Sequence, residues 1–215
     1  MPKHHFTHVA HWVFDLDNTL YPPHARLFDQ IEVKMTQYVM DALGVDRAHA
    51  NFLRKDYWQR YGTTLAGLMQ EHDVDPTPYL THVHEISLDH LEPDTELRRG
   101  ISALPGRKIV YTNGSAPYAE RVIAARGLNG VFDAIYGVEH ADFHPKPDAR
   151  AFAAVFARDG VEPMLGAMFE DDARNLAVPH DLGMRCVHVA PERGTGDHIH
   201  HHTVDLTEFI TRLTR

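Results

Sequence analysis

The sequence predicts an α/β fold, a Rossmann-like parallel sheet into which a bundle of helices is inserted. Short apolar runs alternate with helical patterns along the second half of the chain, as in doubly wound parallel sheets. The stretch from Leu20 to about Gly106 is too long for one crossover and is rich in helical periodicity. We therefore expect a core domain of residues 1–20 and 96–215 and a helical cap domain of residues 21–95.

Five apolar runs are expected to form the strands of the sheet. Each is short, and a short apolar run is consistent with a fully buried strand of a parallel sheet. In chain order the runs cover residues 11–14, 108–111, 134–136, 167–169 and 185–189. Polar or glycine-rich residues closely follow every run except the last, so polar groups are expected where open α/β sheets bind their ligands.

The insertion contains four amphipathic segments that predict the helices of the cap. Their apolar residues recur at helical spacing within residues 27–39, 52–61, 65–69 and 80–91. An all-helical insert placed directly after the first strand is expected to lie over the strand tips. There it can act as a lid that excludes water and selects the substrate.

Helical periodicity also predicts the helices of the core. It covers residues 118–126, 148–159 and 175–182, and a further amphipathic helix is expected over residues 203–213. Histidines are concentrated just before that last helix, in the tract His198–His202. Histidine clusters can bind transition metals, but we interpret this tract, and the group His4, His5 and His8, as solvated loops.

Length, charge and cysteine content narrow the possible functions. The 215 residues, 43% of them hydrophobic, suffice for one large domain or a core with a small accessory domain. Against 30 acidic residues there are 21 Lys and Arg, and the formal net charge of −9 argues against a nucleic acid polymer or an anionic membrane surface as partner. Any phosphate should therefore be bound locally.

The single cysteine, Cys186, rules out an internal disulfide framework and a multi-cysteine zinc site. No run approaches the roughly 18 apolar residues of a membrane span, and residues 1–14 lack the apolar run of a secretion signal. We expect a cytoplasmic protein with no membrane partner and leave its oligomeric state open.

Two carboxylates, Asp15 and Asp17, directly follow the first predicted strand. Side chains alternate along a strand, so the two carboxylates can point the same way. Alternatively, a chain that turns there can present one carboxylate and the next backbone carbonyl. Both arrangements make a site for a cation or a phosphoryl group. Taken alone, the motif is equally consistent with a capped turn.

Three further motifs follow the next strands in order. The second strand leads into Thr112-Asn113-Gly114-Ser115, whose hydroxyl and backbone amides suit anionic oxygens. The third leads to Lys146, with a proline on either side that restricts the backbone, and then to Asp148, a candidate helix cap.

The fourth strand ends in Glu170-Asp171-Asp172, with Asn175 a turn later. Three neighbouring carboxylates repel one another unless something cationic lies among them. Each motif alone fits an ordinary turn or a surface loop. Together, at successive strand ends of one parallel sheet, they predict a single active site.

The motifs resemble those of the haloacid dehalogenase superfamily. Its members carry an Asp-x-Asp-x-Thr motif, then a Thr or Ser, then a Lys, then a paired acidic motif, on a Rossmann-like core. The resemblance covers nearly the whole chain. Residues 14–22, 27–31, 35–39, 111–114 and 169–176 resemble, more narrowly, the pyrimidine 5′-nucleotidase branch.

The resemblance implies a phosphatase mechanism. Asp15 would be the nucleophile that forms an aspartyl-phosphate, which water then hydrolyses. Asp17 would protonate the departing alcohol and then accept a proton from the water. Members that cleave carbon–halogen bonds generally lack an acid at that position, because a halide leaves without a proton.

The same resemblance implies Mg²⁺ as cofactor. Its ligands would be Asp15, the backbone carbonyl of Asp17, and Asp171, with Glu170 ligating directly or through water. Asp172 occupies a position that is often held by a small residue.

Lys146 would neutralise the charge of Asp15 and of the phosphate. Thr112 and the amide of Asn113 would hold phosphate oxygens, within a loop that also contains Gly114.

Several alternatives stay open. The expected substrate is a small phosphate monoester, most simply a pyrimidine nucleoside 5′-monophosphate, but the core motifs fit a sugar phosphate or phosphoglycolate equally well. Tyr21 and Tyr57 are the aromatic candidates for stacking on a base, unless they are packed inside the cap.

Readings from other classes fit the sequence less well. A phospho-acceptor signalling domain shares the acid pair, Thr, Lys and Mg²⁺, but it needs neither the second acid at Asp17 nor a lid. A catalytically silent binding module is disfavoured because every chemical position is filled.

Overall fold

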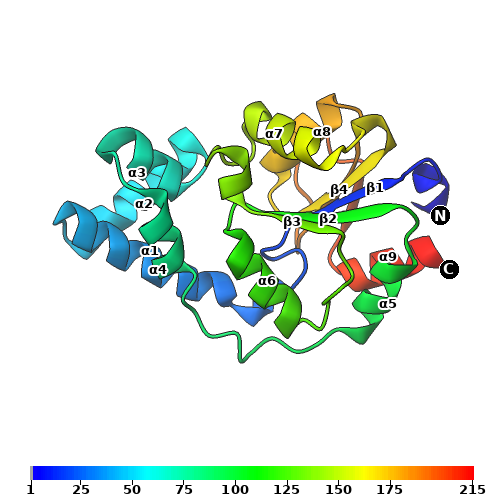
Figure 1. The fold of residues 1–215 in the computed structure, drawn as a ribbon, viewed down its shortest axis with the longest axis horizontal. Helices are drawn as coiled ribbons and strands as arrows, with labels where there is room; N and C mark the ends of the chain where they lie inside the picture. The colour runs from blue at the N-terminus through cyan, green and yellow to red at the C-terminus, as the bar shows by residue number, and fades with distance from the viewer. Residues whose placement is uncertain (1) are drawn as a thin grey trace.

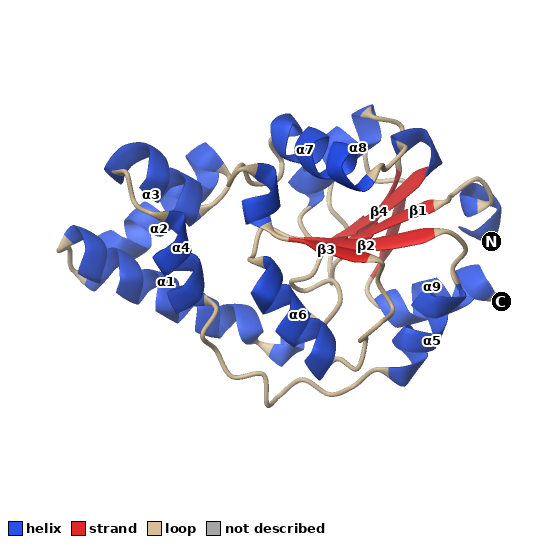
Figure 2. Cartoon of the chain, viewed as in Figure 1, coloured by secondary structure: helices blue, strands red, loops and turns tan. Residues whose placement is uncertain are grey.

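The computed structural model describes residues 2–215 and has the predicted α/β architecture. Its central sheet has six strands in the order β3-β2-β1-β4-β5-β6, and every pairing is parallel. The strands are β1 (His11–Phe14), β2 (Arg107–Tyr111), β3 (Ala134–Tyr136), β4 (Gly166–Glu170), β5 (Arg185–Val189) and β6 (His201–Thr203). The five predicted strands are therefore confirmed (Figure 2).

The first strand lies at the centre of the sheet, between β2 and β4. Its alternate residues enter different layers: Trp12 and Phe14 pack into the larger apolar cluster, and Val13 packs into the smaller one. This alternation is what a strand buried on both faces requires. It fixes the register and therefore the direction in which the residues after Phe14 leave the sheet.

Helices cover both faces of the sheet. Helices α7 (Ala149–Asp159) and α8 (Ala177–Asp181) lie on one face, and α5 (Thr95–Ala103), α6 (Ala116–Ala125) and α9 (Leu206–Thr214) lie on the other (Figure 1). Helix α7 buries Phe152 and Val155, as predicted. Short 3₁₀ helices occur at Pro2–Phe6, Pro23–Ala25, Val138–Ala141, Pro163–Leu165 and Ala173–Leu176.

The single helix expected over residues 175–182 is instead a 3₁₀ turn, Ala173–Leu176, followed by the short α8. Asp172 caps this turn, because its side chain accepts a hydrogen bond from the backbone N–H of Arg174. The turn places Asn175, which is buried, directly behind the acidic motif.

Four helices form the insertion after β1, as predicted: α1 (Leu27–Leu43), α2 (Arg47–Tyr61), α3 (Thr64–His72) and α4 (Pro76–Val83). They lie beyond one edge of the core, beside the end of the sheet (Figure 1). The last segment is shorter than its periodicity suggested, because Ile86 and Leu91 follow the end of α4 in the connection back to the core.

Only part of the histidine tract forms the loop that we expected. His201 to Thr203 form β6, which pairs with β5 through backbone hydrogen bonds that do not depend on side-chain polarity. The ring of His201 packs against Phe6, with 5.1 Å between ring centroids. The backbone N–H of Cys186 donates to Nδ1 of His200 over 3.0 Å. The end of the tract, His201 and His202, is thus part of an edge strand, whereas residues 198–200 form the loop that precedes it.

Among residues 2–215, no helix is long and apolar enough to cross a membrane.

Candidate active site

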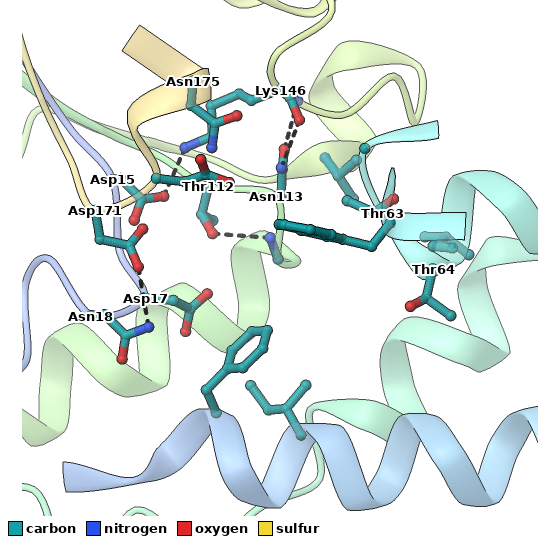
Figure 3. A pocket seen from close by; sticks show the side chains of 18 of the residues that line it. Asp15, Asp17, Asn18, Thr63, Thr64, Thr112, Asn113, Lys146, Asp171 and Asn175 are labelled. Carbon is teal, nitrogen blue, oxygen red and sulfur yellow. Dashed lines mark hydrogen bonds and ion pairs between the residues drawn. The ribbon is translucent and has the colours of Figure 1, made fainter. Parts of the chain in front are cut away.

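The four sequence motifs meet at the C-terminal edge of the sheet, in one cavity of about 490 Å³ between the core and the inserted helices (Figure 3). Its lining includes Asp15, Asp17, Thr112, Lys146 and Asp171. The sheet hydrogen bonding continues beyond the strands, because the N–H of Asp15 donates to the carbonyl of Phe169 over 2.9 Å. The backbone of the first acidic residue is therefore still paired with the neighbouring strand.

Lys146 is the central cation of the site and is only 1% exposed. Its Nζ lies 2.7 Å from Asp15 Oδ1 and 2.6 Å from Glu170 Oε2. Burial alone would lower the pKa of Lys146, but the two carboxylates outweigh burial and raise it. The ammonium is therefore held charged between two acids.

The backbone of Lys146 is fixed by Asn113. Asn113 Oδ1 accepts a hydrogen bond from the Lys146 N–H over 2.8 Å, and Asn113 Nδ2 donates to the Lys146 carbonyl over 3.1 Å. The loops after β2 and β3 are thus joined by a side chain that pairs with the main chain as a neighbouring strand would. No pattern in the sequence indicated this pairing.

Asp15, Glu170 and Asp171 form an acidic cluster in which one carboxylate oxygen from each residue lies within 4.8 Å of the other two. Burial, followed by the charge of Glu170, raises the pKa of Asp15 to about 8. Burial and the charges of Glu170 and Asp15 also raise the pKa of Asp171. Since the ionised cluster is unfavourable as it stands, a hard divalent cation with oxygen ligands fits this position.

The three acids after β4 are not equivalent. Both oxygens of Glu170 are engaged, Oε2 with Lys146 and Oε1 with the N–H of Asp172. Asp172 turns to the guanidinium of Arg174, which lies 2.6 Å away. Asp171 faces the cavity, and its Oδ2 accepts a long hydrogen bond, 3.2 Å, from Asn18. Asp171 and Asp15 are therefore the acids that are best placed for a cation.

Asp17 lies in the same cavity and is half-buried. Its Oδ1 accepts hydrogen bonds from two tyrosine hydroxyls, Tyr21 at 2.6 Å and Tyr118 at 2.8 Å. Burial raises the pKa of Asp17, and the two hydrogen bonds oppose that rise. A carboxyl whose pKa is raised can hold a proton closer to neutral pH.

The loop after β2 brings a hydroxyl to the cavity. Thr112 is almost fully buried, and its Oγ1 accepts a hydrogen bond from the N–H of Gly114 over 2.9 Å. The Gly114 amide, which we expected to be available for phosphate, is therefore paired within the loop. The hydroxyl proton of Thr112 remains a donor toward the cavity.

The aromatic residues at the cavity differ from those that the sequence suggested. Tyr21 and Tyr57 are both buried, and neither lines the cavity, so they are packed residues. Trp58 and Phe28 line it and are 46% and 40% exposed. Because successive residues of a helix point about 100° apart, the inward Tyr57 could have indicated that Trp58 faces elsewhere.

An arginine from the core packs on one face of the Trp58 ring, which stays 46% exposed. The guanidinium carbon of Arg174 lies 3.7 Å from the centroid of the Trp58 ring, which makes a cation–π contact between α2 and the turn after the acidic motif. This contact joins the insertion to the core at the mouth of the site, and sequence reasoning did not find it.

Comparison with known proteins gives a family match over most of the chain. A family model described as haloacid dehalogenase-like hydrolase matches residues 10–183. Phosphate metabolism protein 8 of Saccharomyces cerevisiae is 27% identical over 187 residues, which are 80% of this chain and 58% of that protein. The fructose-1-phosphate phosphatase YqaB of Escherichia coli is 29% identical over 127 residues, which are 56% of this chain and 66% of that protein.

The chain thus spans less than two thirds of the length of both curated relatives. Among solved structures, a HAD phosphatase from Thermococcus onnurineus has a TM-score of 0.63 at 17% identity, and covers 95% of this chain and 98% of its own. The magnesium-bound HAD-hydrolase YfnB from Bacillus subtilis has a TM-score of 0.62 at 15% identity, with coverage of 96% and 99%. At such identities the structural likeness establishes the fold alone.

Proposed function

This chain belongs to the haloacid dehalogenase-like hydrolases, and from that membership we propose that it is a Mg²⁺-dependent phosphatase of small phosphate monoesters, with a pyrimidine nucleoside 5′-monophosphate as preferred substrate. We also propose that residues 21–95 act as a cap domain over a core of residues 1–20 and 96–215. The pairing of Asp15 and Asp17 in one cavity carries the proposal.

Asp15 is the proposed nucleophile. Its carboxylate attacks phosphorus in line, and the bond to the leaving oxygen breaks as an aspartyl-phosphate forms. Lys146, 2.7 Å from Asp15 Oδ1, offsets the charge of the nucleophile and of the incoming phosphate. The hydroxyl of Thr112 and the N–H of Asn113 are the proposed donors to the phosphate oxygens.

Asp15 and Asp171 are the proposed Mg²⁺ ligands, with the Asp17 carbonyl and Glu170 as further candidates. Bound there, the cation would supply charge neutralisation for the acidic cluster and for the phosphate oxygens. The raised pKa values of Asp15 and Asp171 support this placement, since these carboxyls are not stable as a cluster of bare anions.

Asp17 is the proposed general acid and base. It protonates the departing alkoxide and then takes a proton from the water that hydrolyses the aspartyl-phosphate. An alkoxide is a poor leaving group without such a proton, whereas a halide needs none. A carboxyl at this position therefore favours phosphatase over dehalogenase chemistry, and it is superfluous in a phospho-acceptor domain.

The lining of the cavity supports a flat leaving group. Large apolar side chains are usually buried, yet Trp58 and Phe28 are both partly exposed where they line this cavity. A pyrimidine ring stacked on such a side chain would remove that surface from water. A sugar phosphate is the second candidate, because a relative is named a fructose-1-phosphate phosphatase and the hydroxyls of Thr63 and Thr64 also line the cavity.

The test is a phosphate-release panel in Mg²⁺ with UMP, CMP, AMP, GMP, fructose 1-phosphate and phosphoglycolate. We expect kcat/KM to be highest for UMP and CMP, and we expect Trp58→Ala to lower kcat/KM for UMP about tenfold, the loss of roughly 1–2 kcal/mol of stacking. The matched control is Phe52→Ala, which truncates an exposed aromatic residue outside the cavity lining.

Three outcomes would contradict the proposed substrate, the proposed turnover or the phosphatase activity itself. Highest activity on fructose 1-phosphate, with no effect of Trp58→Ala, would replace the nucleotide by the sugar phosphate. Stable labelling of the protein without release of phosphate would indicate a phospho-acceptor domain. Release of halide from 2-haloacids in place of phosphate would overturn the phosphatase itself.

A further inference from the structure

The carboxylate of Asp17 is held at one oxygen only. Tyr21 and Tyr118 both donate to Oδ1, over 2.6 and 2.8 Å. A carboxylate oxygen has two lone pairs, so two phenol donors fill the acceptor capacity of Oδ1. Asp17 Oδ2 is left without a hydrogen-bond donor from the described part of the chain, and Asp17 lines the cavity.

The two tyrosines are themselves fixed. Each is 1% exposed. Tyr21 lies in the connection between β1 and the cap helices, and Tyr118 lies in α6. The ring of His84, at the end of α4, stacks on Tyr118 with 4.3 Å between centroids and 4° between planes. The Nδ1 of His84 in turn lies 3.0 Å from Ser115 Oγ.

We propose that Tyr21 and Tyr118 are positioning residues that reserve Asp17 Oδ2 for the transferred proton and direct it at the leaving oxygen. The proposal rests on the proposed phosphatase function. While both phenols donate to Oδ1, an acidic proton on Asp17 is carried by Oδ2 and is kept from rotating away from the cavity. By orienting the acid in this way, the two tyrosines lower the barrier of the proton transfer without contacting the substrate themselves.

The phosphorus–oxygen bond to the leaving group breaks, the bond from Asp15 to phosphorus forms, and the Oδ2 proton moves to the leaving oxygen, giving a neutral alcohol and the Asp17 carboxylate. The attacking water later returns a proton to the same oxygen as inorganic phosphate is released. The tyrosines keep their own protons throughout.

The loss of kcat/KM on removing either tyrosine hydroxyl should depend on the leaving group. The alkyl phosphate for this test is UMP, or whichever alkyl phosphate of the panel is the best substrate. In Tyr21→Phe and Tyr118→Phe, we expect kcat/KM for this substrate to fall about ten- to a hundredfold, within the range of general acid catalysis. For p-nitrophenyl phosphate, whose phenolate leaves without protonation, we expect less than about a threefold change. The ratio kcat/KM is the appropriate measure because it includes only steps through release of the alcohol.

The matched control is Tyr136→Phe. Its hydroxyl also donates to a carboxylate, Asp159 Oδ1 at 2.9 Å, but outside the cavity. This variant should retain the parent kcat/KM for both substrates. Melting temperatures of all variants identify any that fail to fold, and since each tyrosine is tested singly, the variant that folds carries the test.

Equal losses on both substrates, or no loss on either, would overturn the positioning role while the phosphatase stands. Failure of the parent to release phosphate from any monoester would overturn the proposed function itself.

Discussion

At the scale of single residues, the site depends on one ammonium among several acids. The amide variant Asp15→Asn removes the proposed nucleophile but little volume, so phosphate release should fall at least about a thousandfold. Because burial disfavours the ionised form of Asp15, the melting temperature without metal should be unchanged or higher. Asp41→Asn, at an exposed helix position, is the control for both measurements. Turnover of Asp15→Asn near the parent rate would contradict the mechanism.

Removal of the Lys146 ammonium should have the opposite effect and should lower the free energy of unfolding. In Lys146→Met, the carboxylates of Asp15 and Glu170 lose their common partner, so we expect the free energy of unfolding to fall by about 3 kcal/mol or more. The ion pair between half-buried Lys34 and exposed Glu85 supplies the control Lys34→Met, with a loss below about 1 kcal/mol. Urea titration without metal measures both variants, and a loss below 1 kcal/mol in Lys146→Met would show that the acids protonate instead.

Some residues of the site could be predicted from their position in the sequence, and others could not. Asp15 and Asp171 could be predicted because each directly follows a buried strand, so the position of the strand implies the position of the side chain. Lys146 lies ten residues after β3 and was predicted from its proline-flanked place in the ordered series of motifs. Tyr118 and Arg174 could not, because Tyr118 reaches Asp17 from 101 residues away and Arg174 packs on a tryptophan of another element. Pairings of that kind follow from the angle between elements, which helical periodicity does not specify.

At the scale of elements, the tips of β1 and β4 together make the proposed cation site. Mg²⁺ that binds only the folded state should raise the free energy of unfolding by about 2.7 kcal/mol at a Mg²⁺ concentration of a hundred times the Kd. The melting temperature should rise accordingly. In Asp171→Asn we expect less than half of that shift and a matching loss of activity, whereas Asp41→Asn should retain the full shift. Differential scanning fluorimetry with and without Mg²⁺ measures the effect, and an undiminished shift in Asp171→Asn would exclude that ligand.

Close packing of α2 against α3 supports the wall of the cavity that carries Trp58. A Cβ placed on Gly67 of α3 would lie 2.2 Å from Cγ of Tyr57, a residue of α2 that is 3% exposed. Gly67→Ala should therefore lower the free energy of unfolding by about 1–3 kcal/mol, despite the better helix propensity of alanine. Chemical denaturation measures this, with the exposed Gln70→Ala as control. A gain in stability would mean that the two helices separate at little cost.

The elements that the sequence predicts well are those with strong periodicity or complete burial. The strands β1, β2, β4 and β5 are apolar runs, and α7 has a continuous apolar face. Strand β6 was missed because its residues are polar at the edge of the sheet, where backbone pairing with β5 decides the structure. Helix α5 lies in a region rich in helical periodicity, but its partner α9 is more than a hundred residues away, and only the fold shows that Gly100 meets Ile210.

At the scale of the whole molecule, the connection from the cap back to the core contains a titratable group. Burial, and then the charge of Arg121, lowers the pKa of His84 from 6.5 to about 4. The groups around its ring are Tyr118 and Ser115. Between pH 6.5 and about pH 4, His84 binds a proton in the unfolded chain but not in the folded chain. The free energy of unfolding therefore falls as the pH decreases through this range.

We expect His84 to account for about 2 kcal/mol of the stability lost between pH 7 and pH 5. Urea unfolding at the two pH values should therefore show a smaller difference for His84→Gln than for the parent. The exposed His24→Gln should retain the parent difference. Identical pH dependence in His84→Gln and the parent would contradict the assignment.

The two hydrogen bonds between Asn113 and the main chain of Lys146 have a consequence for dynamics. A backbone amide in a proline-flanked loop normally exchanges its hydrogen with solvent quickly, yet this one is buried and donates to Asn113 Oδ1. Deuterium uptake at Lys146 should thus be as slow as in the central strands and should accelerate only when the loops after β2 and β3 separate. One amide signal then reports how often the two loops that form the candidate active site separate in solution.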